Sequence, residues 1–103
     1  MAQYEGTEDA TGQRFAIVVS IYNEFVTGSL LQAAIETLTQ AGAKPEAIDI
    51  AKVPGAFEIP LVARRLAKSR QYDAIICLGA VIRGETAHFD YICNETSRGI
   101  AQA

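Results

Sequence analysis

The sequence predicts a single α/β domain in which helices cover both faces of a parallel sheet. The chain has 103 residues and is 50% hydrophobic, which suits one domain with one buried core. Apolar runs typical of strands alternate along it with stretches of helical periodicity, in the order β-α-β-α-β-α. Short links between alternating strands and helices favour a parallel sheet with right-handed crossovers.

The first strand and the first helix follow a polar segment. Residues 1–14 are acidic and poor in apolar side chains, and we expect them to form an arm rather than part of the core. Residues 15–20 form a continuous run rich in β-branched residues, as in a strand buried on both faces. From Thr27 apolar residues recur at helical spacing and Gly42 follows as a terminator, which predicts a helix of about four turns.

The second strand is predicted over residues 47–53. There Ile48 and Ile50 alternate with polar neighbours, as in a half-covered strand, and Pro54 with Gly55 ends the run. A second helix follows, with Pro60 tolerated in its first turn. Its apolar stripe is predicted to consist of Ile59, Val62, Ala63, Leu66 and Ala67.

The third strand is predicted as a buried run over residues 74–81, and a third helix follows it. The inner stripe of this helix is predicted to consist of Phe89, Ile92, Cys93, Thr96 and Ile100. The helix runs to Ala103 without a capping signal, and three strands make a thin sheet for a doubly wound fold. We therefore expect either that neighbouring chains complete the sheet or that the sequence is a fragment of a longer polypeptide.

Composition excludes several classes of function. The formal net charge is −3 and no Lys/Arg-rich stripe occurs, which argues against nucleic acid and anionic membranes as partners. No apolar run is long enough to cross a bilayer, and the N-terminal residues lack the apolar core of a secretory signal. Cys77 and Cys93 show neither zinc-site nor disulfide-framework spacing. We therefore expect a cytoplasmic protein without a metal site.

Three loops are expected to share one edge of the sheet, because parallel strands all end there and open α/β folds bind ligands at that edge. The segments are residues 21–23, 53–58 and 81–88. Tyr22 and Phe57 could bind a flat heterocycle through stacking and edge contacts, or they could pack in the core. Glu58 could accept hydrogen bonds from ligand hydroxyls or could cap the second helix. Arg83 could form an ion pair with Glu58, Glu85 or Asp90 or could bind an anion, and we assign it a structural role by default.

The third loop carries an anion-site candidate. Gly84, Glu85 and Thr86 lead into the third helix, whose positive dipole end attracts a phosphate. The alternative is that the glycine only turns the chain and the threonine only caps the helix. His88 falls in the first turn of the third helix. It could transfer protons in a reaction, or it could be an exposed histidine with no functional role. Because the sequence contains no motif for an activated nucleophile, any enzymatic nucleophile must come from the substrate.

These loops resemble the lumazine synthase family of riboflavin biosynthesis. The matching segments are VPGAFEIP at 53–60 and GAVIRGETAHFDY at 79–91, with support from YEG at 4–6, YN at 22–23 and CNETSRGIAQA at 93–103. The resemblance implies a three-layer α/β/α, flavodoxin-like fold for a single domain over residues 1–103. It also implies that the family's last strand and two C-terminal helices are absent after Ala103.

The family condenses 5-amino-6-ribitylamino-2,4(1H,3H)-pyrimidinedione with 3,4-dihydroxy-2-butanone 4-phosphate to 6,7-dimethyl-8-ribityllumazine, releasing phosphate and water. The resemblance implies the same transferase activity here, without metal or organic cofactor. It further implies small-molecule substrates and assembly of the chain with itself, as a homopentamer or as an icosahedral shell of pentamers. The alternatives are a non-catalytic shell-forming or ligand-binding module of the same fold and, more weakly, a flavodoxin-like flavin binder.

The resemblance also assigns roles to residues. Tyr22 would stack on the pyrimidine and His88 would be the proton shuttle, while Ile21 stands where many relatives carry a basic residue. The remaining candidates form three groups. Asn23 and the backbone of Val81 and Ile82 would surround the pyrimidine ring. Ala56, Phe57 and Glu58 would hold the ribityl chain, and Gly84, Glu85 and Thr86 would bind the phosphate.

Overall fold

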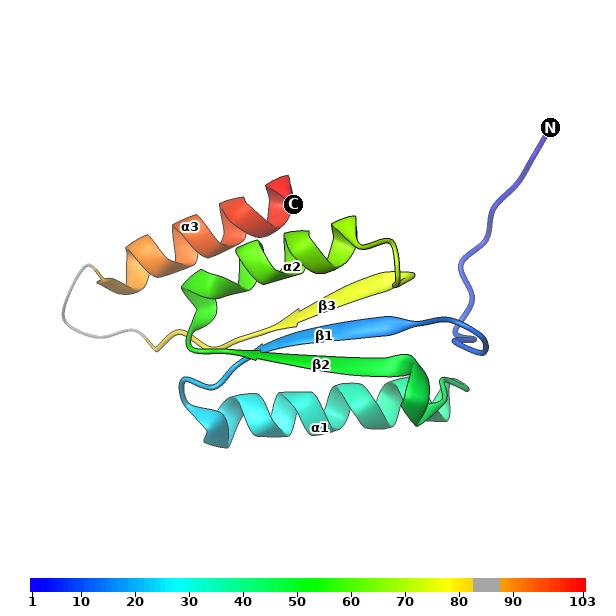
Figure 1. The fold of residues 1–103 in the computed structure, drawn as a ribbon, viewed down its shortest axis with the longest axis horizontal. Helices are drawn as coiled ribbons and strands as arrows, with labels where there is room; N and C mark the ends of the chain where they lie inside the picture. Colours follow the sequence, from blue (N-terminus) through cyan, green and yellow to red (C-terminus); the bar gives the residue numbers. More distant parts are fainter. Residues whose placement is uncertain (83–87) are drawn as a thin grey trace.

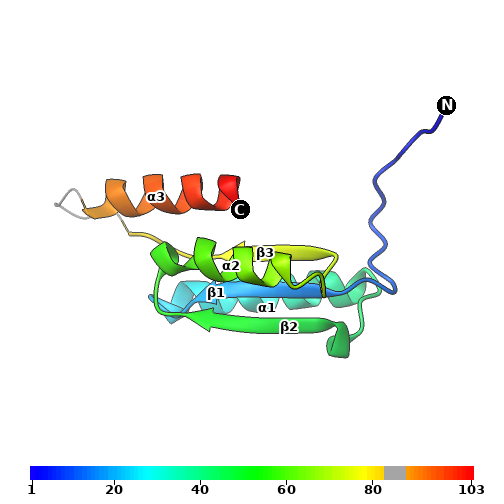
Figure 2. The same cartoon turned by 45° about the horizontal axis from the view of Figure 1, so that its top comes forward.

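The computed structural model describes residues 1–82 and 88–103, which fold into a three-layer α/β/α arrangement (Figure 1). The strands are β1 (Phe15–Ser20), β2 (Ile48–Val53) and β3 (Ala74–Leu78). Helix α1 (Glu24–Gln40) covers one face of the sheet, and α2 (Ile59–Lys68) and α3 (His88–Gln102) cover the other (Figures 1 and 2). The predicted element order and the parallel sheet are confirmed.

Strand β1 is the centre of the sheet, whose strand order is β2-β1-β3. Both neighbours run parallel to it, with Phe15 opposite Ile48 on one side and Ala74 on the other. All six residues of β1 are buried, because the strand is paired along both edges and covered by helices on both faces. The prediction of a strand buried on both faces is therefore confirmed.

The two outer strands are less buried than the sequence suggests. Strand β3 ends at Leu78 rather than at residue 81, and its residues are half-buried or exposed. On β2 the Ile50 side chain is 45% exposed, although its alternation with polar neighbours predicted a covered position. The reason is that, within the described residues, each of these strands has a neighbouring strand on one side only.

Helix α1 starts three residues before the predicted Thr27, at Glu24, because Asn23 turns the chain with a left-handed backbone of φ 57°. Its end agrees with the prediction, since Gly42 has φ 107° just beyond the helix. A Cβ at Gly42 would also collide with Thr11 Oγ1.

The N-terminal segment lies partly on the body of the molecule. Residues 1–9 are exposed and extend away from it (Figure 1). Ala10, by contrast, is buried with Phe15 and Ala43, and its N–H donates to the Ala41 carbonyl at 2.9 Å. The C-terminal part of the predicted arm therefore packs into the core.

Helices α2 and α3 pack beside each other over the sheet (Figures 1 and 2). On α2 the predicted stripe faces the core except for Ala67, which is exposed. On α3 the predicted inner positions are half-buried except for Ile100, which is 40% exposed. Both exceptions lie in the last turn of their helices. No described helix combines the length and apolar character needed to span a membrane.

Candidate substrate pocket at the end of the sheet

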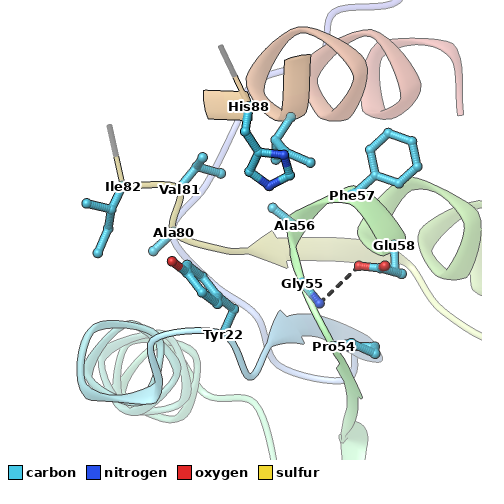
Figure 3. Close-up of a pocket in the computed structure, with 11 residues that line it drawn as sticks. Tyr22, Pro54, Gly55, Ala56, Phe57, Glu58, Ala80, Val81, Ile82 and His88 are labelled. Carbon is cyan, nitrogen blue, oxygen red and sulfur yellow. Dashed lines mark hydrogen bonds between the residues drawn. The ribbon is translucent and has the colours of Figure 1, made fainter. Parts of the chain in front are cut away.

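A pocket of about 360 Å³ opens at the edge where the three strands end (Figure 3). Segments that follow all three strands contribute to it, together with the start of α3. The lining residues are Tyr22, Pro54, Gly55, Ala56, Phe57, Glu58, Ala80, Val81, Ile82, His88 and Ile92. The loops that the topology predicted to converge therefore do so around one hollow.

The segment after β1 brings Tyr22 to the pocket. Beyond the strand, Ile21 N–H donates to the Val53 carbonyl at 2.8 Å, and Tyr22 N–H donates to the Pro54 carbonyl at 3.1 Å. These bonds extend the β1–β2 pairing by two residues and fix the Tyr22 backbone at the sheet edge. The Tyr22 side chain is 56% exposed, and it lines the pocket together with Ala80 (Figure 3).

The segment after β2 forms a tight turn held by Glu58. Its carboxylate accepts a hydrogen bond from Gly55 N–H at 3.0 Å, while Glu58 N–H donates to the Gly55 carbonyl at 3.2 Å. This reciprocal pair caps the short 3-10 helix Ala56–Glu58 and shapes one wall of the pocket. Glu58 therefore caps this 3-10 helix, but its side chain makes no capping hydrogen bond to α2, the helix that it was expected to cap. Its carboxylate has further lone pairs with which to accept from a ligand.

The segment after β3 and the start of α3 close the other side. Ala80, Val81 and Ile82 line the pocket, and His88 is the first residue of α3. The His88 side chain is exposed and its ring lies over Ala56 (Figure 3). The positive end of the α3 dipole opens on the same hollow, an arrangement that favours a bound anion.

The pocket gathers most of the residues that the sequence singled out. Those brought together are Tyr22, Ala56, Phe57, Glu58, Val81, Ile82 and His88. Asn23 does not line it and instead occupies the N-cap position of α1. Arg83, Gly84, Glu85 and Thr86 lie outside the described residues.

Four lining residues were not predicted. Pro54 and Gly55 belong to the loop 53–58 that was expected at the sheet edge, but they were not chosen as site residues. Ile92 lies four residues after His88, which puts both on one face of α3. Ala80 carried no signal of its own.

A smaller cavity of about 220 Å³ shares Ala56 and Val81 with the pocket. Both cysteines line it, and burial raises the pKa of the Cys77 thiol. Within the described residues, no three His, Cys, Asp or Glu side chains come together as a metal-binding group.

Comparison with known proteins identifies the relatives of this chain. The family model for 6,7-dimethyl-8-ribityllumazine synthase matches residues 12–103. The curated 6,7-dimethyl-8-ribityllumazine synthase of Desulfatibacillum aliphaticivorans is 59% identical over 97 residues, which cover 94% of this chain and 63% of the relative. The chain thus spans less than two thirds of the length of that relative. With nearly its whole length matched, the chain belongs to the 6,7-dimethyl-8-ribityllumazine synthase family.

Proposed function

We propose that this protein is a transferase of riboflavin biosynthesis that forms 6,7-dimethyl-8-ribityllumazine. Its substrates are 5-amino-6-ribitylamino-2,4(1H,3H)-pyrimidinedione and 3,4-dihydroxy-2-butanone 4-phosphate, and it releases phosphate and water. One observation carries the proposal: in a chain of this family, the loops after three parallel strands meet around a single pocket of about 360 Å³. That volume suits a small, flat ligand with a polar chain.

The pyrimidine substrate occupies the pocket between the loops after β1 and β3. Its ring stacks on Tyr22 and is framed by the backbone of Val81 and Ile82. Its ribityl chain runs along the turn at Ala56 and Phe57, where the Glu58 carboxylate accepts hydrogen bonds from the hydroxyls. The mixed apolar and polar lining of the pocket supports this orientation.

The phosphate of the second substrate binds at the start of α3. We assign it to Gly84, Glu85 and Thr86, which lie outside the described residues but directly precede the helix. The α3 dipole supports an anion at this place.

The chemistry requires positioning and proton transfer. The substrate amine forms a bond to the carbonyl carbon of the butanone, and the carbonyl oxygen leaves as water once it has been protonated and the amine deprotonated. His88 faces the pocket from the start of α3 and can carry these protons (Figure 3). Holding two reactants in one pocket supplies the larger share of the acceleration.

We further propose that the protein acts in the cytoplasm as a homo-oligomer, a pentamer or an icosahedral shell of pentamers. Large apolar side chains on its surface support self-association: Phe25 is 91% exposed, Tyr91 69% and Leu61 61%. A second copy that covered such side chains would remove apolar area from water.

A second candidate is a ligand-binding module that does not turn over. The openness of the pocket favours it, since the side chains of Tyr22, Phe57 and Ile82 are each more than half exposed. Walls of this kind admit water and weaken the electrostatic effects on which catalysis relies.

The test is to mix both substrates with the purified chain and follow lumazine absorbance. The proposal predicts a rate above that of the uncatalysed mixture and proportional to protein concentration. A flat assay would contradict it. If calorimetry in the same buffer then showed binding of the ribitylamino-pyrimidinedione, the non-catalytic module would be the correct assignment.

A further inference from the structure

Gly79 follows the last residue of β3 and leads into residues 80–82, all of which line the pocket. Gly79 itself does not line the pocket. Its backbone is not in the left-handed region, which is the commonest reason for a glycine. The absence of a side chain at this position therefore has another cause.

The surroundings of Gly79 leave no room for a side chain. A Cβ at this position would lie 2.9 Å from Ile59 Cδ1, whereas carbon atoms in contact normally lie about 3.5 to 4.0 Å apart. Ser20 Oγ at 3.4 Å and Ala56 Cβ at 3.5 Å would also touch it. These three neighbours belong to the end of β1, the turn after β2 and the start of α2. Gly79 therefore lies where the end of the sheet meets α2.

The three neighbours of Gly79 are fixed in the core. Ser20, Ala56 and Ile59 are 0%, 7% and 2% exposed. Ala56 and Ile59 also pack in one core cluster with Val18. Gly79, by contrast, is exposed. Because a packed core resists displacement, a methyl group at position 79 would push the segment after β3 away from α2, and residues 80–82 with it.

We propose that Gly79 is a positioning residue: its missing side chain lets the segment after β3 lie close to Ile59 and so sets the pocket wall formed by residues 80–82 (Figure 3). This inference rests on the proposed function for the pyrimidine ring that the wall frames. Gly79 acts through the backbone of the residues that follow it.

The first test combines Gly79→Ala with Ile59→Val in steady-state assays of lumazine formation. Valine lacks Cδ1, the one Ile59 atom among the three atoms nearest to the added Cβ. We expect Gly79→Ala to raise KM for the pyrimidine about 5- to 30-fold, as the lower part of an overpacking penalty predicts. KM for the butanone phosphate should change by a smaller factor, because that substrate is assigned to the start of α3. In the double variant, KM for the pyrimidine should return to the value of Ile59→Val alone.

Gly42→Ala controls for a loss of stability without a change of the wall. The added Cβ would collide with Thr11 Oγ1, and φ at Gly42 is 107°. This position follows α1 and lies beside the cluster that contains Phe15, the first residue of β1. Gly42→Ala should therefore lower the urea midpoint of unfolding and leave KM for the pyrimidine unchanged.

The second test needs no substrate. In ¹⁵N amide spectra of the free chain, Gly79→Ala should shift the Val81 and Ile82 amides, and adding Ile59→Val should return them toward their parent positions. If neither the parent nor any variant forms lumazine or binds the pyrimidine while these shifts behave as expected, the proposed function fails and the positioning role stands.

Three results would overturn the proposal. An unchanged KM and unchanged amides in Gly79→Ala would mean that Ile59 yields into the 220 Å³ cavity that it lines. A raised KM that Ile59→Val does not restore would mean that the contact with Ile59 is not the cause. If Gly79→Ala does not fold, the double variant carries the test: it should fold with the KM of Ile59→Val, and a double variant that is also unfolded contradicts the proposal.

Discussion

His88 is the one imidazole of the chain, and it faces the pocket from the first position of α3. General acid and base groups typically contribute about 10²- to 10⁴-fold to a rate. Attack of an amine on a ketone is intrinsically easy, so we expect His88→Ala to lower kcat by about 10²-fold, the low end of that range. Asp90→Asn is the matched control, since Asp90 is exposed on the same helical turn and does not line the pocket.

The two extreme results for His88→Ala are equally informative. An unchanged kcat would remove His88 from the proton transfers. A rate equal to the uncatalysed one would show that positioning by the remaining residues contributes little, contrary to the mechanism proposed above.

Ser20 is the last residue of β1. Its side chain is fully buried and, among the described residues, its Oγ has no hydrogen-bond partner. A buried hydroxyl without a partner costs about 1 to 3 kcal/mol. We therefore predict that Ser20→Ala raises the free energy of unfolding, by up to about 1 kcal/mol after loss of packing, in urea denaturation. Thr27→Val, which removes a buried hydroxyl that contacts Asn23 O at 3.4 Å, should instead lower it.

A loss of stability in Ser20→Ala would contradict this account. It would mean that the hydroxyl is paired in solution, for example with an ordered water or with a group outside the described residues.

At the scale of elements, the contact of α3 with α2 holds His88 over the pocket. A Cβ placed on Gly99 of α3 would lie 2.6 Å from Cβ of Pro60, a rigid ring at the start of α2. In α1, a Cβ on Gly28 would meet nothing within 4 Å. The two helical glycines therefore form a matched pair.

We predict opposite effects for alanine at these glycines. Gly28→Ala should raise the free energy of unfolding by about 0.5 to 1 kcal/mol through helix propensity. Gly99→Ala should lower it by about 1 to 3 kcal/mol, because overpacking outweighs the same propensity gain. Gly99→Ala should also lower kcat, since a displaced α3 carries His88 with it. Equal stabilisation by both substitutions would show that α3 does not pack closely on α2.

The sequence predicted well those elements whose structure follows from the residue types within a short segment. The run at 15–20 is apolar throughout and became the central strand, and Gly42 ended α1 as its conformational freedom suggested. The end of β3 was wrong because residues 79–81 are as apolar as a strand, yet they line two cavities instead of pairing. Apolar character alone cannot distinguish these two uses.

The site could be predicted to the level of loops but not of side chains. Parallel topology brings the three strand ends together, which placed Tyr22, Glu58 and His88 around one pocket. It does not say which side chains of a loop point inward. Asn23 follows Tyr22 directly, yet it does not line the pocket and instead occupies the N-cap position of α1.

At the scale of the molecule, the chain exposes 7447 Å², whereas a compact 11.1 kDa monomer exposes about 5,700 Å². Its radius of gyration of 15.0 Å also exceeds the roughly 13 Å expected for a domain of this length. The extended residues 1–9 and the exposed apolar side chains account for this excess. Both quantities fit a protomer that buries more surface in an assembly.

We therefore predict that the chain sediments as an oligomer at micromolar concentration. Phe25, which is 91% exposed on α1, is the largest apolar contribution of that helix to the surface. Phe25→Glu should shift the distribution toward the 11.1 kDa monomer, whereas Gln40→Glu, which adds the same charge at the exposed end of α1, should not. A parent chain that sediments only as a monomer would contradict the proposed assembly.

The central claim is that the loops after β1, β2 and β3 form one binding site for a ribityl-pyrimidine. Its most direct test is a titration of the ¹⁵N-labelled chain with 5-amino-6-ribitylamino-2,4(1H,3H)-pyrimidinedione, followed by amide NMR. We predict that Tyr22, Ala56 and Val81, one from each loop, shift together along a single saturating curve. Shifts confined to one loop, shifts at the opposite end of the sheet, or no saturable shift would contradict the claim.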